Sequence, residues 1–129
     1  MKVSDLMVGD LVYIHEPECK GHRIDAIDEL DGQVGADGEV YDECDIRPIP
    51  LTEKILVKNG FHTYGESYFI PEDKCNAHVR IGFHYRETVV DLHRHGAFSI
   101  QISYKPGMLY VHTLQHLLRE RGIDKEIEL

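Results

Sequence analysis

Nine histidines stand among the 129 residues, and one group of them has the composition of a metal site. The segment Asp91-Leu92-His93-Arg94-His95 alternates so that, in a strand, Asp91, His93 and His95 share one face. A carboxylate and two imidazoles are ligands that a divalent ion such as zinc accepts. Neighbours on an adjacent strand could include His84 or His78. The alternative interpretation is an ordinary polar outer face that ends in a glycine turn.

A second histidine pair has helical spacing. His112 and His116 are four residues apart, the separation that zinc enzymes use to present two ligands on one turn. The intervening residues lack the glutamate that would act as general base. At 100° per residue the pair falls opposite the apolar stripe of Val111, Leu114 and Leu118, so we expect it to face solvent or a partner. Ordinary surface histidines are the alternative.

The remaining motifs do not indicate catalysis. Cys19, Cys44 and Cys75 form an odd set without C-x-x-C spacing, which is typical of reduced, incidental thiols. No phosphate-binding loop and no nucleophile elbow stands in the sequence. We therefore assign no catalytic residue and no residue that binds an organic cofactor. The sequence favours a protein that is not an enzyme.

Charge limits the classes of partner. The formal net charge of −9 disfavours nucleic-acid backbones and anionic membranes, and favours basic or neutral protein partners. Five arginines of the second half could still form a limited basic face: Arg80, Arg86, Arg94, Arg119 and Arg121. Neither a signal-peptide pattern nor an apolar run long enough to span a bilayer is seen, so we expect a cytoplasmic protein without a membrane partner.

The pattern predicts an α+β fold in two units. In residues 1–50, short β-branched and aromatic runs alternate with Gly/Asp turns about ten residues apart, which is typical of a small SH3-like β-barrel. The segment Asp45 to Glu53 then reads as a joint, because Pro48 and Pro50 favour extended geometry. Residues 51–129 are expected to form an α+β unit, an antiparallel sheet with two helices.

The second unit begins with the clearer helix. Thr52 is a good N-cap, Leu51 and Leu56 have the spacing of a hydrophobic staple, and Gly60 with Phe61 predicts the end of a helix over about 53–59.

Three strands and a second helix follow. The strands are expected over 78–85, 88–93 and 98–104, with an edge strand at Tyr68 and Ile70. We expect a second helix from about Val111 to Gly122, and we expect the charged tail from Asp124 to fray.

The chain resembles a group of short hypothetical proteins encoded by prophages and mobile elements of Bacteroides and related gut bacteria. The shared motifs are Val8-Gly9-Asp10-Leu11-Val12 near the start, Pro48-Ile49-Pro50-Leu51-Thr52-Glu53 at the joint and Tyr110-Val111-His112-Thr113-Leu114-Gln115 near the end. The resemblance implies an accessory protein inside a bacterial cell. It implies no activity and no catalytic residue.

Three functional hypotheses result. The first is a non-enzymatic module that binds an unidentified protein partner. The second is a metal-binding protein or metal-dependent hydrolase that uses Asp91, His93 and His95. The third is a nucleic-acid-binding accessory protein that uses the arginines of the second half, against the net charge.

Overall fold

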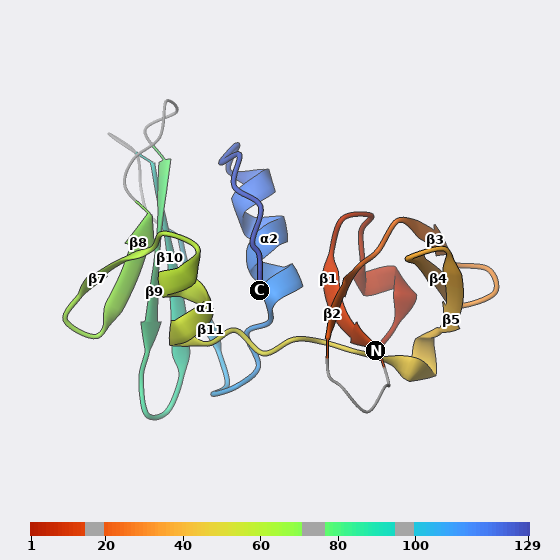
Figure 1. Ribbon diagram of the computed structural model, residues 1–129. Coiled ribbons are helices and arrows are strands. Elements are labelled where there is room, and N and C mark those ends of the chain that lie inside the picture. The colour runs from red at the N-terminus through yellow and green to blue at the C-terminus, as the bar shows by residue number, and fades with distance from the viewer. Residues whose placement is uncertain (15–19, 71–76, 95–99) are drawn as a thin grey trace. The chain divides into compact units, whose positions relative to one another are not determined.

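The computed structural model describes residues 1–14, 20–70, 77–94 and 100–129, with the backbone alone for 77, 78, 93 and 94. The chain divides into two compact units, Met1–Ile49 and Pro50–Leu129, called unit 1 and unit 2 below. The sequence pattern predicts the division one residue later, after Pro50. Each unit is described by itself (Figure 1).

Unit 1 consists of two open, antiparallel, three-stranded sheets with strand orders β2-β1-β6 and β3-β4-β5. Its elements are η1 (Val3–Asp5), β1 (Leu11–Ile14), β2 (Gly21–Arg23), β3 (Ala26–Asp28), β4 (Gln33–Ala36), β5 (Glu39–Asp42), η2 (Glu43–Asp45) and β6 (Ile46–Arg47). Among the described residues no pairing joins one sheet to the other, so a closed SH3-like barrel stays a prediction.

Both sheets of unit 1 contribute to one small core. The buried side chains come from the strands, from η1 and from the segments between them: Val3, Leu6, Val12, Ile14, Ile24, Val34, Ala36 and Ile46. The turn before β1 is fixed by Asp10, whose buried carboxylate accepts the Met7 N–H at 2.7 Å. Ile24 donates to the Asp10 carbonyl at 2.9 Å, which holds this turn against the end of β2.

Unit 2 contains a five-stranded antiparallel sheet of order β11-β10-β9-β8-β7, and both helices lie on one side of it (Figure 1). Its elements are α1 (Glu53–Lys58), β7 (His62–Tyr64), β8 (Ser67–Ile70), β9 (Ala77–Phe83), β10 (Thr88–Arg94), β11 (Ile100–Tyr104) and α2 (Val111–Glu120). The fold is therefore mixed α+β, as the sequence predicts.

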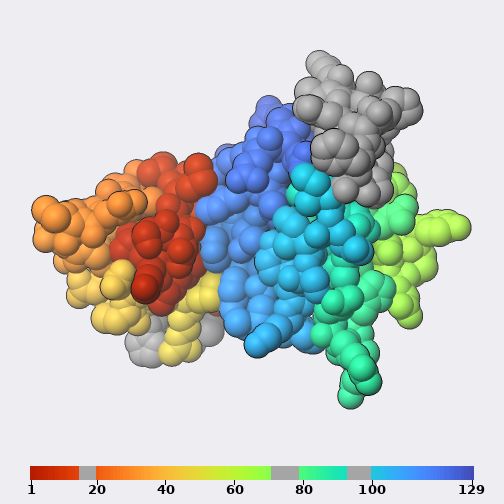
Figure 2. Space-filling view, turned by 180° about the vertical axis from the view of Figure 1, so that it is seen from behind, coloured from red at the N-terminus to blue at the C-terminus, as the bar shows by residue number. Residues whose placement is uncertain are grey.

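The sheet buries one face. Val79, Ile81, Val90 and Leu92 are buried on this face, as a period of two predicts, although Val89 on the opposite face of β10 is also buried, at 7% exposure. A period of two over the predicted strand 78–85 puts Tyr85 on the same buried face as Val79 and Ile81. That prediction is wrong, because β9 ends at Phe83 and the Tyr85 ring is 96% exposed in the next turn. The turns after β7 and β9 project from unit 2 (Figure 2).

The edge strand was misassigned. β8 contains Tyr68 and Ile70 but lies inside the sheet, and the edge beside it is β7. All three residues of β7 are exposed, so the segment has no apolar alternation that could have revealed a strand. It forms because its backbone pairs with β8, from His62 opposite Phe69 to Tyr64 opposite Ser67.

The two helices end in the same way. Phe61 donates to the Leu56 carbonyl at 3.0 Å while Gly60 has a φ of +84°, and Ile123 donates to the Leu118 carbonyl at 2.9 Å. In each case a glycine in the left-handed region is followed by a buried apolar residue, which is the Schellman arrangement. At the other end of α1 the Thr52 Oγ1 accepts the Ile55 N–H at 3.3 Å, so the predicted caps of α1 are confirmed.

The C-terminal segment does not fray as expected. The Gln115 side chain donates to the Lys125 carbonyl and accepts the Ile127 N–H, both at 2.8 Å. The Asn59 side chain does the same around Glu128, donating to its carbonyl at 2.7 Å and accepting its N–H at 2.8 Å. Two amides thus hold the segment as a neighbouring strand would, and they position Ile127 in the core. We call Asn59 and Gln115 the amide clamp.

Neither α1 nor α2, the α-helices of the described ranges, has the length and apolar character that crossing a bilayer requires.

Replacing Gln115 by alanine should lower the free energy of unfolding by about 2 kcal/mol, because two hydrogen bonds are lost and the buried Ile127 N–H is left without its acceptor. Urea denaturation of the full chain measures this. Gln101→Ala, at an exposed glutamine of β11, is the matched control and should change stability by less than about 0.5 kcal/mol. Equal stabilities of the two variants would contradict the role of the clamp.

Candidate functional site

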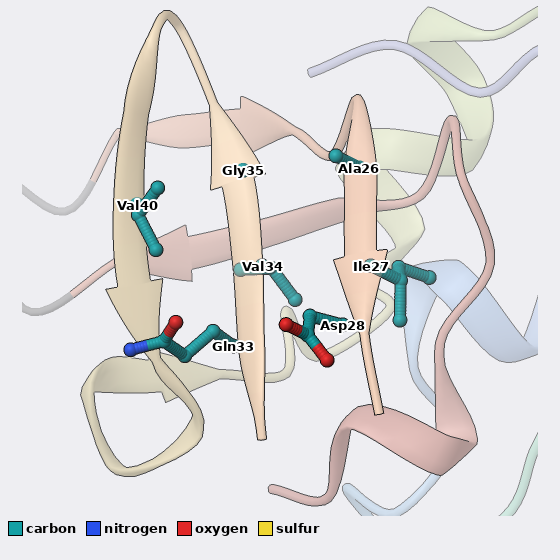
Figure 3. Close-up of a pocket in the computed structure, with 7 residues that line it drawn as sticks. All are labelled: Ala26, Ile27, Asp28, Gln33, Val34, Gly35 and Val40. Atoms are coloured by element: carbon teal, nitrogen blue, oxygen red, sulfur yellow. The ribbon is translucent and has the colours of Figure 1, made fainter. Parts of the chain in front are cut away.

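The outer face of the β3-β4-β5 sheet carries a shallow hollow of about 180 Å³ (Figure 3). Ala26, Gly35 and Val40 lie side by side across the three strands and line it. Further lining comes from Ile27, Asp28, Gln33 and Val34. Pockets for small molecules typically measure about 300–1,000 Å³, so this hollow has room for a side chain rather than a cofactor.

Gly35 forms the floor of the hollow. A Cβ atom at this position would lie 2.9 Å from the Asp25 Oδ1 and 3.2 Å from the Ala26 Cβ. The hollow therefore exists because residue 35 has no side chain, and any substitution would begin to fill it. On its two sides are Ala26, which is exposed, and Val40, which is 67% exposed.

Carboxylates surround this apolar strip. Asp25, Asp28 and Asp42 are all exposed, and strand alternation places Asp28 and Asp42 on the same face as Val40. The Asp28 carboxylate accepts the Leu30 and Asp31 N–H groups at 3.1 Å, which fixes the turn after β3. In that turn the Leu30 side chain is 96% exposed.

The net charge of the protein resides in unit 1. Residues 1–49 contain thirteen acidic and four basic side chains, a formal charge of −9, whereas residues 50–129 contain ten of each. The sequence shows the same asymmetry, with acidic runs at 25–31 and 39–45 in the first unit and five arginines in the second half. Counting each predicted unit separately gives its full size.

A group of possible metal ligands lies after β5. One ligand atom from each of Asp42, Cys44 and Asp45 lies within 4.8 Å of the others. Asp42 and Cys44 are exposed, and exposed acidic groups often gather in this way without an ion. The group therefore carries no metal assignment. Cys19 and Cys75 lie outside the described residues.

The structure places the predicted metal residues on β10. Asp91 and His93 lie two residues apart on this strand, and His95 lies outside the described residues. The register sets His93 opposite His78 and Asp91 opposite Arg80. Of the two suggested cross-strand neighbours, His78 is therefore adjacent.

His84 does not join that group. Its imidazole covers Gly82, because the Nε2 atom lies 2.8 Å from where a Gly82 Cβ would be. Gly82, which pairs with Val89, lies four residues along β9 from His78.

His112 is buried, so the prediction that it faces solvent or a partner is wrong. α2 buries His112 and Gln115 as well as its apolar residues, which makes its buried face wider than the apolar stripe suggests. The His112 ring stacks on Tyr110 with centroids 5.8 Å apart, and the half-buried His116 lies edge-on to it at 5.7 Å.

Two tyrosines of unit 2 have raised pKa values. Burial raises the pKa of Tyr68 above 10.0, and a hydrogen bond to Glu53 and the negative charge of that carboxylate raise it further. Burial also raises the pKa of Tyr104, and the charge of Glu120 adds to this effect. Both shifts favour the neutral phenol, so these side chains serve packing rather than nucleophilic chemistry.

Comparison with protein-family models, curated proteins and solved structures finds no match to this chain. The geometry is therefore the basis for any functional assignment.

The tyrosine shifts predict how stability depends on alkaline pH. A pKa that is raised on folding gives stability that is complete below the unfolded value of 10.0 and is lost as pH rises through the folded value. Tyr68→Phe and Tyr104→Phe should each reduce the stability lost between about pH 9 and about pH 11. Urea denaturation at several pH values tests this, with Tyr85→Phe at the exposed ring as control. If both variants lose as much stability as the control, the burial of these phenols does not have this effect.

Proposed function

We propose that the protein is a non-enzymatic interaction module whose unit 1 binds a positively charged segment of a partner protein. The observation that carries the proposal is the exposed apolar strip of Ala26 and Val40 over Gly35, with carboxylates around it on one sheet face. The surface that comprises Asp25, Ala26, Asp28, Gly35, Val40 and Asp42 is called the acidic face below.

Each part of the acidic face has a physical task in this proposal. The carboxylates attract a basic segment at long range and orient it, which raises the association rate more than the affinity. The hollow then accepts one apolar side chain of the partner, and removal of that side chain from water stabilises the complex. Basic residues on either side of one small or branched apolar residue would fit both tasks.

The finer architecture belongs to the same proposal: unit 1 is an SH3-like barrel. Three observations support it. Only Ile24 and Asp25 separate β2 from β3, so one chain segment passes from the first sheet into the second. Residues of both sheets share one core, and a single 3₁₀ turn, η2, lies between β5 and β6.

The setting of this function is inferred from the resemblance to prophage and mobile-element proteins. We infer an accessory role in the cytoplasm of a bacterial cell. The odd number of cysteines supports a reducing compartment. A nucleic-acid partner is disfavoured because unit 1 would repel phosphate and unit 2 has no excess of positive charge.

Val40→Lys should abolish partner binding, because it places a cation in the hollow and opposes a basic segment. Affinity capture of the tagged protein from a Bacteroides lysate, followed by mass spectrometry, measures the recovered partner. Val57→Lys is the matched control, since Val57 is 55% exposed on α1 of unit 2. Recovery should fall at least about tenfold for Val40→Lys, equivalent to about 1.4 kcal/mol, and stay unchanged for Val57→Lys.

Two results would contradict the proposal. One is equal recovery of the same partner by the two lysine variants. The other is an eluate whose absorbance at 260 nm shows bound nucleic acid.

A further inference from the structure

The cross-strand register of β9 and β10 brings two histidines and a carboxylate together. His93 is paired with His78, and Asp91 is two residues before His93 on the same strand. Val79 and Leu92 are buried, so strand alternation assigns His78, His93 and Asp91 to the opposite, outer face of the sheet. These positions come from the backbone register alone.

The spacing suits a single metal ion. Directly opposed residues of an antiparallel pair have Cβ atoms about 4.5–5.5 Å apart, and zinc binds each imidazole nitrogen at about 2.0–2.1 Å. Ligands at two directly opposed positions can therefore reach one ion. Asp91 is about 7 Å along β10 from His93 and diagonal to His78, within the reach of a third ligand.

The outer face is open to solvent beside this group. The next row of the sheet runs from His62 through Phe69, Arg80 and Asp91 to Gln101, and His62, Arg80 and Gln101 are exposed. Arg80 stands opposite Asp91 and is a cation at the margin of the group, so it should weaken the binding of a metal ion.

We propose that His78, His93 and Asp91 form a binding site for a divalent transition metal of the zinc class on the outer face of unit 2. Three protein ligands leave a fourth coordination position for water or for a ligand group of another molecule. The site does not depend on the proposed partner binding, because the acidic face is on unit 1.

The proposal predicts one equivalent of Zn²⁺ bound by tag-free full-length protein, measured by competition with a chromophoric chelator. A Cys44→Ser background removes the thiol between Asp42 and Asp45 as a competing ligand. Loss of groups that only orient a metal ligand costs about 10–100-fold in affinity, so His78→Ala and His93→Ala should each weaken binding by at least about tenfold. His84→Ala is the matched control and should leave the affinity unchanged.

Two further measurements keep the test independent of the alanine variants. Excess Zn²⁺ should raise the urea midpoint of the unsubstituted chain, because an ion that binds only the folded state stabilises it. Arg80→Gln should tighten binding by removing the neighbouring cation. The proposal is overturned if the unsubstituted chain binds no Zn²⁺ and shows no shift in midpoint, or if His84→Ala weakens binding as much as His93→Ala.

Discussion

Unit 1 carries many negative charges around a small hydrophobic core, and this combination limits its stability. Thirteen acidic side chains belong to 49 residues, and eight side chains of the part of unit 1 that the structure describes form its buried cluster. Mutual repulsion of these carboxylates opposes folding, and a core of this size offers limited hydrophobic stabilisation. The stability of unit 1 therefore depends on the contacts that each carboxylate makes.

Several carboxylates offset this cost by holding turns. Asp10 and Asp28 accept backbone N–H groups, Glu43 accepts the Val3 N–H at 3.2 Å, and Asp37 pairs with His22 at 2.6 Å. Hydrogen bonds to charged acceptors are stronger than neutral ones, so these contacts fix the loops of a short chain. Beside Val40, Asp28 holds the turn after β3 and Asp42 accepts the Gln33 Nε2–H at 3.0 Å, but both carboxylates stay exposed on one sheet face. A basic partner would relieve their repulsion, which is why we place the function on the acidic face.

Local signals in the sequence predicted local structure well. The caps of α1 were predictable because Thr52, Gly60 and Phe61 act within one helical turn of the residues that they contact. The burial of Val90 and Leu92 agrees with the period of two along their strand. The α+β class follows from these patterns together.

Features that depend on distant partners could not be predicted. Ile127 is buried because Gln115 and Asn59 hold the backbone around it, and nothing near Ile127 in the sequence indicates this. The hollow at Gly35 depends on Ala26 and Val40 being its register partners, and only the alignment of β9 with β10 distinguishes His78 from His84 as the neighbour of His93. A single sequence shows which residues could do chemistry but not which of them the sheet brings together.

The central claim is that a basic segment binds on the acidic face, and NMR chemical-shift mapping tests it most directly. A short peptide in which lysine and arginine surround one leucine is titrated into isotopically labelled protein near physiological salt. We predict shifts that concentrate on residues 25–42, and no shifts with a glutamate-substituted peptide. Shifts that concentrate in unit 2, or no shifts with the basic peptide, would contradict the account.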